Sequence, residues 1–165
     1  MAEERLVLSD ASPLIGLAAA HGFELLRRLF SVVSVTPEVR AEVLADEKRP
    51  GAPQLRAALR ARWIRVLRGK WPEPEFSRLG EGEASILRAA ANLGGDTIVL
   101  LDDETARREA VRLRIAVTGT LGILAVARRR SLIPAVRPYL ARLAEHGFYF
   151  SQDLARELLR SVGEE

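Results

Sequence analysis

The stretch from Thr97 to Asp103 constrains the fold more than any other part of this 165-residue chain. Its first five residues are β-branched or aliphatic and run directly into two adjacent aspartates, with Gly94-Gly95-Asp96 just before them. A continuous apolar run of this length, bounded by turn residues, is typical of a strand that is buried on both faces. Helical patterns flank the run, which indicates an α/β fold: a central parallel sheet with helices packed on each side.

The composition excludes several classes of protein. The chain has no cysteine, so neither a disulfide framework nor a thiolate zinc site can form. No apolar run approaches the roughly 20 residues that cross a bilayer, and the acidic stretch from Met1 to Arg5 does not resemble a secretory signal. We therefore expect a cytoplasmic protein with no membrane segment. We expect one domain over residues 1–165, with its core at about 5–145 and a C-terminal helix at about 151–162.

The net charge of +3 rests almost entirely on arginine, since Lys48 and Lys70 are the only lysines. Guanidinium groups fit phosphates well, so a polyanionic partner is compatible with this composition. A GC-rich or thermophilic genome that places arginine on solvated helix faces explains it equally well. The arginines that could follow a nucleic-acid backbone are Arg107, Arg108, Arg112, Arg114, Arg128, Arg129 and Arg130.

Strand and helix patterns alternate along the whole chain. We expect strands at 6–9, 31–35, 63–67, 97–101 and 115–117, with 97–101 at the centre of the sheet and the alternating run 63–67 at its edge. We expect helices at 14–20, 23–30, 38–45, 54–61, 80–93, 104–114, 119–129, 135–145 and about 151–162. Ser12-Pro13 and Thr36-Pro37 are each typical of an N-cap followed by proline at the first helical position. The irregular segment 69–77 either folds over a site or connects elements.

Two strand-end aspartates are the first candidates for a functional site. Asp10 follows the strand at 6–9 and Asp102 follows the strand at 97–101. The carboxyl ends of parallel strands form the edge at which such sheets bind ligands. Either residue alone would most often be a plain cap or turn aspartate.

Two acids on helices are candidates for the same edge. At about 100° per residue, Glu83 lies in the middle of the apolar face that Ile86 and Leu87 define. The alternative is that Glu83 is a solvated acid of the first helical turn, favoured by the helix dipole. Glu42 falls about 60° from Val39 and is a better inward candidate than Glu38, although a surface position fits it nearly as well.

Carboxylates brought together repel and raise one another's pKa, and a divalent cation removes that conflict. Hard oxygen ligands without histidine or cysteine favour Mg²⁺ or Mn²⁺ over zinc. The chemistry that such a centre indicates is phosphodiester hydrolysis by metal-activated water.

Other residues are weaker candidates. Thr118-Gly119-Thr120 could hold a phosphate at a helix start, although threonine there is more often an N-cap. His21 and His146 lie beside glycines at expected helix ends, where loop or cap roles are usual. Trp63 and Trp71 flank the irregular segment, and we expect packing roles for both.

Several motifs together resemble the PIN-domain family, and in particular a VapC-like prokaryotic branch. The resemblance spans the chain from residue 6 to about residue 164 and rests on segments 7–15 (VLSDASPLI), 36–43 (TPEVRAEV), 80–87 (GEGEASIL), 100–107 (LLDDETAR) and 117–124 (VTGTLGIL). It implies a three-layer α/β/α sandwich and an Mg²⁺- or Mn²⁺-dependent endoribonuclease, commonly a homodimer. It also implies the toxin half of a toxin–antitoxin pair, with the antitoxin as a protein partner and RNA as substrate.

The same resemblance assigns roles to individual residues. It implies that Asp10, Glu83 and Asp102 bind the metal and that Glu42 completes a catalytic group of four acids. It further implies that Ser12 supports the first aspartate, and that Asp103 or Thr120 assists at the rim. Many PIN nucleases carry aspartate where this chain has Glu83, and whether Asp102 or Asp103 contacts the metal stays open.

The main alternative is a catalytically weak PIN-like module that binds nucleic acid or a protein. Two other classes use strand-end aspartates. A phosphoaspartate receiver requires a lysine after the last core strand, where neither Lys48 nor Lys70 lies. A haloacid-dehalogenase-like phosphatase requires a second aspartate two residues past the first, where this chain has Ser12. Neither pattern is met.

Overall fold

A computed structural model describes residues 5–165, and its centre is a five-stranded sheet with the order β3-β2-β1-β4-β5. Every neighbouring pair of strands is parallel. The strands are β1 (Leu6–Ser9), β2 (Val33–Val35), β3 (Ile64–Val66), β4 (Thr97–Leu100) and β5 (Ala116–Thr118). The parallel sheet predicted from the apolar run is confirmed, and the alternating run at 63–67 does form an edge strand.

The central strand is β1, so the expectation that 97–101 lies at the centre is wrong by one place. Strand β4 pairs directly with β1, in a register that sets Ser9 beside Leu100. The backbone N–H of Asp10 extends this pairing by donating to the Leu100 carbonyl at 3.0 Å. Asp10 and Asp102 therefore leave the sheet at the same edge, from adjacent strands.

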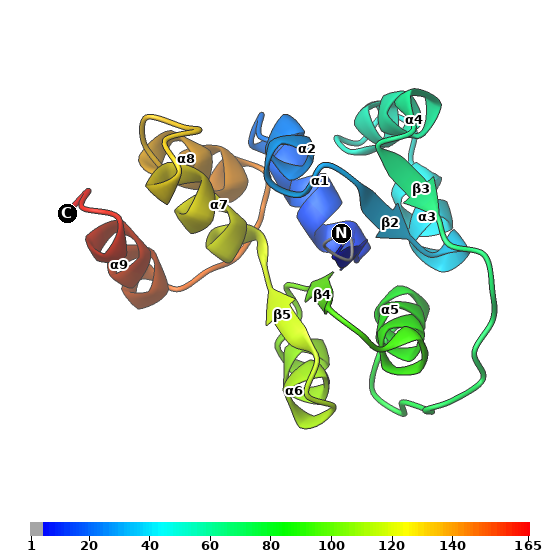
Figure 1. The fold of residues 1–165 in the computed structure, drawn as a ribbon. Coiled ribbons are helices and arrows are strands. Elements are labelled where there is room, and N and C mark those ends of the chain that lie inside the picture. The colour runs from blue at the N-terminus through cyan, green and yellow to red at the C-terminus, as the bar shows by residue number, and fades with distance from the viewer. Residues whose placement is uncertain (1–4) are drawn as a thin grey trace.

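Helices cover both faces of the sheet (Figure 1), with α5 and α6 on one side and α1, α2 and α7 on the other. This confirms the three-layer α/β/α fold class. The helices of the described residues are α1 (Ala11–Ala19), α2 (Glu24–Phe30), α3 (Pro37–Leu44), α4 (Ala52–Ala61), α5 (Glu81–Leu93), α6 (Glu104–Arg112), α7 (Thr120–Arg129), α8 (Arg137–Glu145) and α9 (Gln152–Ser161).

Helix α1 begins two residues earlier than Ser12-Pro13 predicts, because Asp10 and not Ser12 occupies the N-cap position. Pro13 is then the third residue of the helix. The first-turn N–H groups of any helix have no partner within that helix, so proline is tolerated there as well as at the first position. The Thr36-Pro37 prediction is confirmed, since the Thr36 hydroxyl accepts a hydrogen bond from the Val39 N–H at 3.2 Å.

The irregular segment 69–77 is held along α5. Arg88 Nε donates to the Pro74 carbonyl at 3.0 Å, and Asn92 Nδ2 donates to the Glu73 carbonyl at 2.7 Å. The segment thus connects β3 to α5. Trp63, just before β3, is 5% exposed and packs edge-on against Phe23 with ring centroids 5.5 Å apart, which confirms its packing role.

Within residues 5–165, no helix is both long and apolar enough to cross a membrane.

Candidate active site

Asp10 is the most deeply buried acid at the carboxyl edge of the sheet. It holds the N-cap position of α1 with extended backbone, yet its side chain makes no capping hydrogen bond. The residue is only 4% exposed. Its Oδ1 atom has no hydrogen-bond partner among the described residues. A buried polar atom without a partner costs free energy, so the cap interpretation does not account for this side chain.

Asp10 opens into a cavity of about 750 Å³ that Glu42 and Glu83 also line. Gly82 lies between these acids. A Cβ atom at Gly82 would lie 2.8 Å from Glu42 Oε2 and 3.1 Å from Asp10 Oδ1, so both oxygens approach the same point. Three acids that are far apart in sequence, on α1, α3 and α5, therefore meet around one glycine.

The pKa of Asp10 is raised from 3.8 to about 7, with burial as the largest cause, and the N–H of Ala11 partly offsets the rise. The negative charges of Glu42, Glu83 and Asp102 contribute to the same rise, in that order of size. Each of these three acids is thus close enough for its charge to act on Asp10. The mutual repulsion expected of a carboxylate cluster is present here.

Glu83 combines the two interpretations that the helical wheel left open. Its Oε2 accepts a hydrogen bond from the Gly80 N–H at 3.0 Å, as a first-turn acid does. The side chain is also half-buried and lines the cavity with Asp10. Burial raises the pKa of Glu83, the Gly80 N–H lowers it, and the charges of Asp103 and Glu42 raise it again.

Glu42 is exposed to solvent on its own helix, but its carboxylate turns toward Gly82. A buried pair of hydroxyls joins the two helices that carry Glu42 and Glu83. Thr36 Oγ1 and Ser85 Oγ lie 2.7 Å apart, and Ser85 Oγ donates to the Gly82 carbonyl at 2.7 Å. Because a serine hydroxyl has one proton, Thr36 is the donor to Ser85. This contact fixes α3 against α5.

Asp102 has a different environment. Its Oδ1 accepts from the Thr120 N–H and its Oδ2 from the Thr120 hydroxyl, each at 2.7 Å. The expectation that threonine caps the helix after Gly119 is therefore reversed, because Asp102 satisfies the first N–H of α7. Asp103 is the N-cap of α6 and accepts from the Ala106 N–H at 2.8 Å.

Six of the seven predicted site residues line two adjoining cavities, and the seventh, Asp103, lines neither. Asp10, Glu42 and Glu83 line the first, and Asp102 and Thr120 line a second of about 500 Å³. Ser12 lines both. No group of three or more acidic or histidine side chains within residues 5–165 is arranged so as to hold a metal ion.

The donor chemistry nevertheless fits a hard cation. The cavity presents carboxylate oxygens, and one of them, Asp10 Oδ1, is buried without a donor. Mg²⁺ usually takes only one or two protein carboxylates and keeps water or substrate oxygens as its other ligands. Two of the acids around Gly82 would meet that requirement.

Few of the arginines noted in the sequence reach the site. Arg108 and Arg112 pair with Glu104 and Glu109 on the outer face of α6, as expected for a solvated helix. Arg107 instead lines the second cavity, and its Nη1 donates to the Leu101 carbonyl at 3.0 Å. His146 has the predicted cap role, with Nδ1 at 2.9 Å from the Arg142 carbonyl.

One group of basic residues was not predicted from the sequence. Four exposed cations on and around β3 line a groove of about 660 Å³, and none of them pairs with a carboxylate of the described residues. They are Arg62, Arg65, Arg68 and Lys70. Pro37 lines both this groove and the cavity of Asp10. The spacing of three residues between successive arginines, across a predicted edge strand, was the signal that could have identified them.

Comparison with known proteins agrees with this architecture. A family model described as a PIN domain matches residues 6–164. Comparison with curated proteins found no match.

A solved structure of a PilT N-terminus domain protein, SSO1118 from the hyperthermophilic archaeon Sulfolobus solfataricus P2, is similar to this chain with a TM-score of 0.50. The two share 14% sequence identity over 74% of this chain and 92% of that one. At that identity the likeness shows the fold alone. The resemblance to a VapC-like branch stays a prediction. Because the family model covers almost the whole sequence and the fold agrees with it, the chain belongs to the PIN-domain family, whose fold is a nuclease fold.

Proposed function

We propose that this protein is an Mg²⁺- or Mn²⁺-dependent endoribonuclease. The observation that carries the proposal is the buried Asp10 Oδ1, which has no donor and lies in one cavity with two further acids. A fold that keeps an anionic group buried at a raised pKa bears a cost in stability, and such costs are concentrated at functional sites.

In this proposal Asp10 and Glu83 hold the cation, as the family resemblance implies, and Glu42 supplies a further carboxylate from the opposite wall. The bound ion would lower the pKa of the attacking water and stabilise charge on the leaving oxygen. Asp102, which the resemblance also implies as a ligand, we assign to positioning, since Thr120 donates to each of its oxygens and Asp102 lines the second cavity instead of the one that the other acids share. Its charge still acts on Asp10.

A polynucleotide substrate is supported by the basic groove along β3. Arg62, Arg65, Arg68 and Lys70 line it without acidic partners among residues 5–165, and it adjoins the acidic cavity at Pro37. Cations that neutralise phosphates dominate the affinity of proteins for nucleic acids. A chain held in this groove would approach the carboxylates from the β3 side. The preference for RNA over DNA comes from the family resemblance.

The test is cleavage of labelled single-stranded RNA and DNA of equal sequence, with Mn²⁺, with Mg²⁺, or with EDTA. Replacing Asp10→Asn should reduce cleavage at least about 100-fold, since even partners of metal ligands cost 10- to 100-fold when removed. Asp153→Asn is the matched control, because that side chain is 96% exposed on α9. RNA cleavage that persists in EDTA, or that survives in Asp10→Asn, would contradict the proposal.

A second candidate function is a PIN-like module that binds nucleic acid or a protein but cuts poorly. The observation that favours it is the absence, within residues 5–165, of a group of three acids arranged to hold a metal. The same assay separates the two functions. A cutting enzyme releases products when Mn²⁺ is added, whereas a binding module retards RNA on a gel and leaves it intact.

We further propose the biological setting that the resemblance implies: a cytoplasmic toxin, homodimeric, and inhibited by a cognate antitoxin protein. Induced expression of the wild-type chain should then arrest bacterial growth, and expression of Asp10→Asn should not. Equal arrest by both would contradict the toxin role without touching the nuclease proposal.

A further inference from the structure

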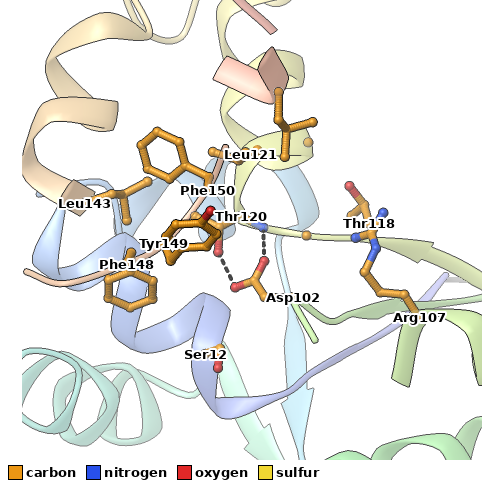
Figure 2. A pocket seen from close by; sticks show the side chains of 13 residues that line it. Ser12, Asp102, Arg107, Thr118, Thr120, Leu121, Leu143, Phe148, Tyr149 and Phe150 are labelled. Atoms are coloured by element: carbon orange, nitrogen blue, oxygen red, sulfur yellow. Dashed lines mark hydrogen bonds between the residues drawn. The ribbon is translucent and has the colours of Figure 1, made fainter. Parts of the chain in front are cut away.

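The second cavity, beside the acids, is lined mainly by apolar side chains (Figure 2). Its volume is about 500 Å³, within the roughly 300–1,000 Å³ typical of sites for small molecules. The aromatic run at 148–150, between α8 and α9, forms one wall together with Leu143 and Leu154. The proposed chemistry does not use these aromatic residues.

In the aromatic run, the first and third residues are packed against the protein and the middle residue is exposed. Phe148 packs so closely on α1 that a Cβ atom at Gly16 would lie 2.9 Å from its ring. Phe148 and Phe150 are half-buried and pack against the core. Tyr149, between them, is 94% exposed. The two neighbours hold the backbone in place while the Tyr149 ring remains in solvent at the mouth of the cavity.

Exposure of large apolar side chains is concentrated here. The large hydrophobic residues exposed among residues 5–165 are Leu93, Val111, Tyr149 and Leu154. Two of these, Tyr149 and Leu154, line the same cavity. Clustered exposed apolar surface indicates a site of interaction, whereas single exposed residues do not.

The polar side of the cavity favours a nucleotide over an apolar protein segment. Arg107 lines it and has no carboxylate partner among the described residues, so its charge is available to a phosphate. Ser12 lines this cavity and also the acidic one, so a chain bound at the acids reaches directly into it. An aromatic surface in the same cavity as a guanidinium without a carboxylate partner is a combination that binds single-stranded nucleic acid.

We infer that this cavity binds the base of a nucleotide next to the scissile phosphate, with Tyr149 as its stacking surface and Arg107 as a contact to the adjoining phosphate. The inference rests on the proposed nuclease function, because it takes the phosphate at Asp10 as the fixed point. It adds a second contact region, on the side of the acids opposite the β3 groove.

The test measures binding without cleavage, in EDTA, by fluorescence anisotropy. The probes are a labelled oligouridylate and an abasic ribose-phosphate oligomer of the same length. Tyr149→Ala should weaken binding of the oligouridylate by roughly tenfold and leave the abasic oligomer unchanged, because base stacking on an aromatic side chain has about this size. Tyr149→Phe should bind like the wild type. Val111→Ala, an exposed apolar residue of α6 outside the cavity, is the control.

Arg107→Gln should behave differently from Tyr149→Ala. It should weaken binding of both oligomers and reduce the slope of log affinity against log salt by about one. A loss confined to the base-bearing oligomer would contradict the phosphate role of Arg107.

Equal weakening of both oligomers by Tyr149→Ala, or no weakening, would overturn the base site. So would a change in sedimentation coefficient on Tyr149→Ala at unchanged RNA affinity, because it would assign the surface to a second copy of the chain. Cleavage assayed with Mn²⁺ on the same preparations keeps the two proposals apart. Tyr149→Ala can lose base-dependent affinity whether or not the protein cuts, and a cutting enzyme can lack the base site.

Discussion

The ends of β1 and β4 have nearly the same sequence pattern, but their aspartates differ in burial and in hydrogen bonding. Each strand is apolar, each is followed by an aspartate, and the two strands are paired in register at Ser9 and Leu100. Asp10 is 4% exposed and leaves one oxygen without a donor in the described part of the chain. Asp102 is half-buried, and Thr120 donates to both of its oxygens.

The difference follows from what comes next in the chain. After β1 the helix begins at once, so Asp10 takes the N-cap position of α1, and its side chain makes no capping hydrogen bond. After β4 there is an extra residue, Leu101, and the start of α7 faces Asp102 from the neighbouring strand. The two strand-end aspartates therefore differ in hydrogen bonding, and Asp10 is the one that keeps an oxygen without a donor among the described residues.

The largest expected effect is on the pH dependence of stability. Because the pKa of Asp10 is raised from 3.8 to about 7, the folded protein holds a proton between these pH values that the unfolded chain has lost. The free energy of unfolding therefore falls as pH rises through this window, by up to about 4 kcal/mol. Asp10→Asn should lack the fall and exceed the wild type in stability above pH about 7. Urea unfolding in EDTA, across that range of pH, measures it.

Identical pH profiles for wild type and Asp10→Asn would show that Asp10 is not held at a cost. Asp153→Asn again serves as the exposed control and should leave the profile unchanged.

The next largest effect is a loss of stability, whereas Asp10→Asn is expected to gain stability. Asp102→Asn should lower the free energy of unfolding by about 1–3 kcal/mol, because it weakens two hydrogen bonds that hold the start of α7. Thr120→Val should lower it by about 1 kcal/mol, since only the hydroxyl contact is lost. Thermal unfolding with and without Mn²⁺ sharpens the contrast. Mn²⁺ should raise the Tm of Asp102→Asn as it does the wild type, and should not raise that of Asp10→Asn.

A loss of the Mn²⁺ shift in Asp102→Asn would restore Asp102 to the ligand set that the family resemblance implies. The two strand ends would then differ in hydrogen bonding but share one role.

The smallest expected effect is on the titration of Asp10 itself. Glu42→Gln removes the carboxylate charge that, of the three, raises the pKa of Asp10 most. That pKa should fall by less than about one pH unit, since burial, the main cause, is unchanged. Asp102→Asn should lower it less than Glu42→Gln does. Carboxyl carbon NMR shifts followed against pH in EDTA would measure both, and the reverse order would contradict the placement of Glu42.

Much of the fold follows from local patterns. Apolar runs gave every strand to within two residues at each end, and alternation identified 63–67 as an edge. The order of the strands was harder to predict, because the most apolar run forms β4, which lies beside the central strand β1. Helix starts failed where a residue before the expected cap took the position, as Asp10 did ahead of Ser12.

The positions of the acids at the sheet edge could be predicted from the sequence, but their hydrogen-bond partners could not. Strand ends and helix faces indicated which acids lie at this edge of the sheet, because both patterns are fixed by backbone geometry, and Asp10, Glu42 and Glu83 do line one cavity. The hydrogen bonds from Thr120 to Asp102 join residues 18 apart in sequence, and no local pattern encodes such a pairing. The aromatic run at 148–150 carried no recognisable motif, since its position beside Ser12 depends on how α8 packs on α1.

At Gly82, helix propensity and the space between the carboxylates make opposite demands on one residue. Glycine inside a helix costs roughly 0.5–1 kcal/mol relative to alanine. A methyl group at 82 would fall 2.8 Å from Glu42 Oε2 and 3.1 Å from Asp10 Oδ1, inside the space that the acids surround. Alanine at 82 would therefore gain helix propensity only by displacing the carboxylates of Glu42 and Asp10 from the space that they share.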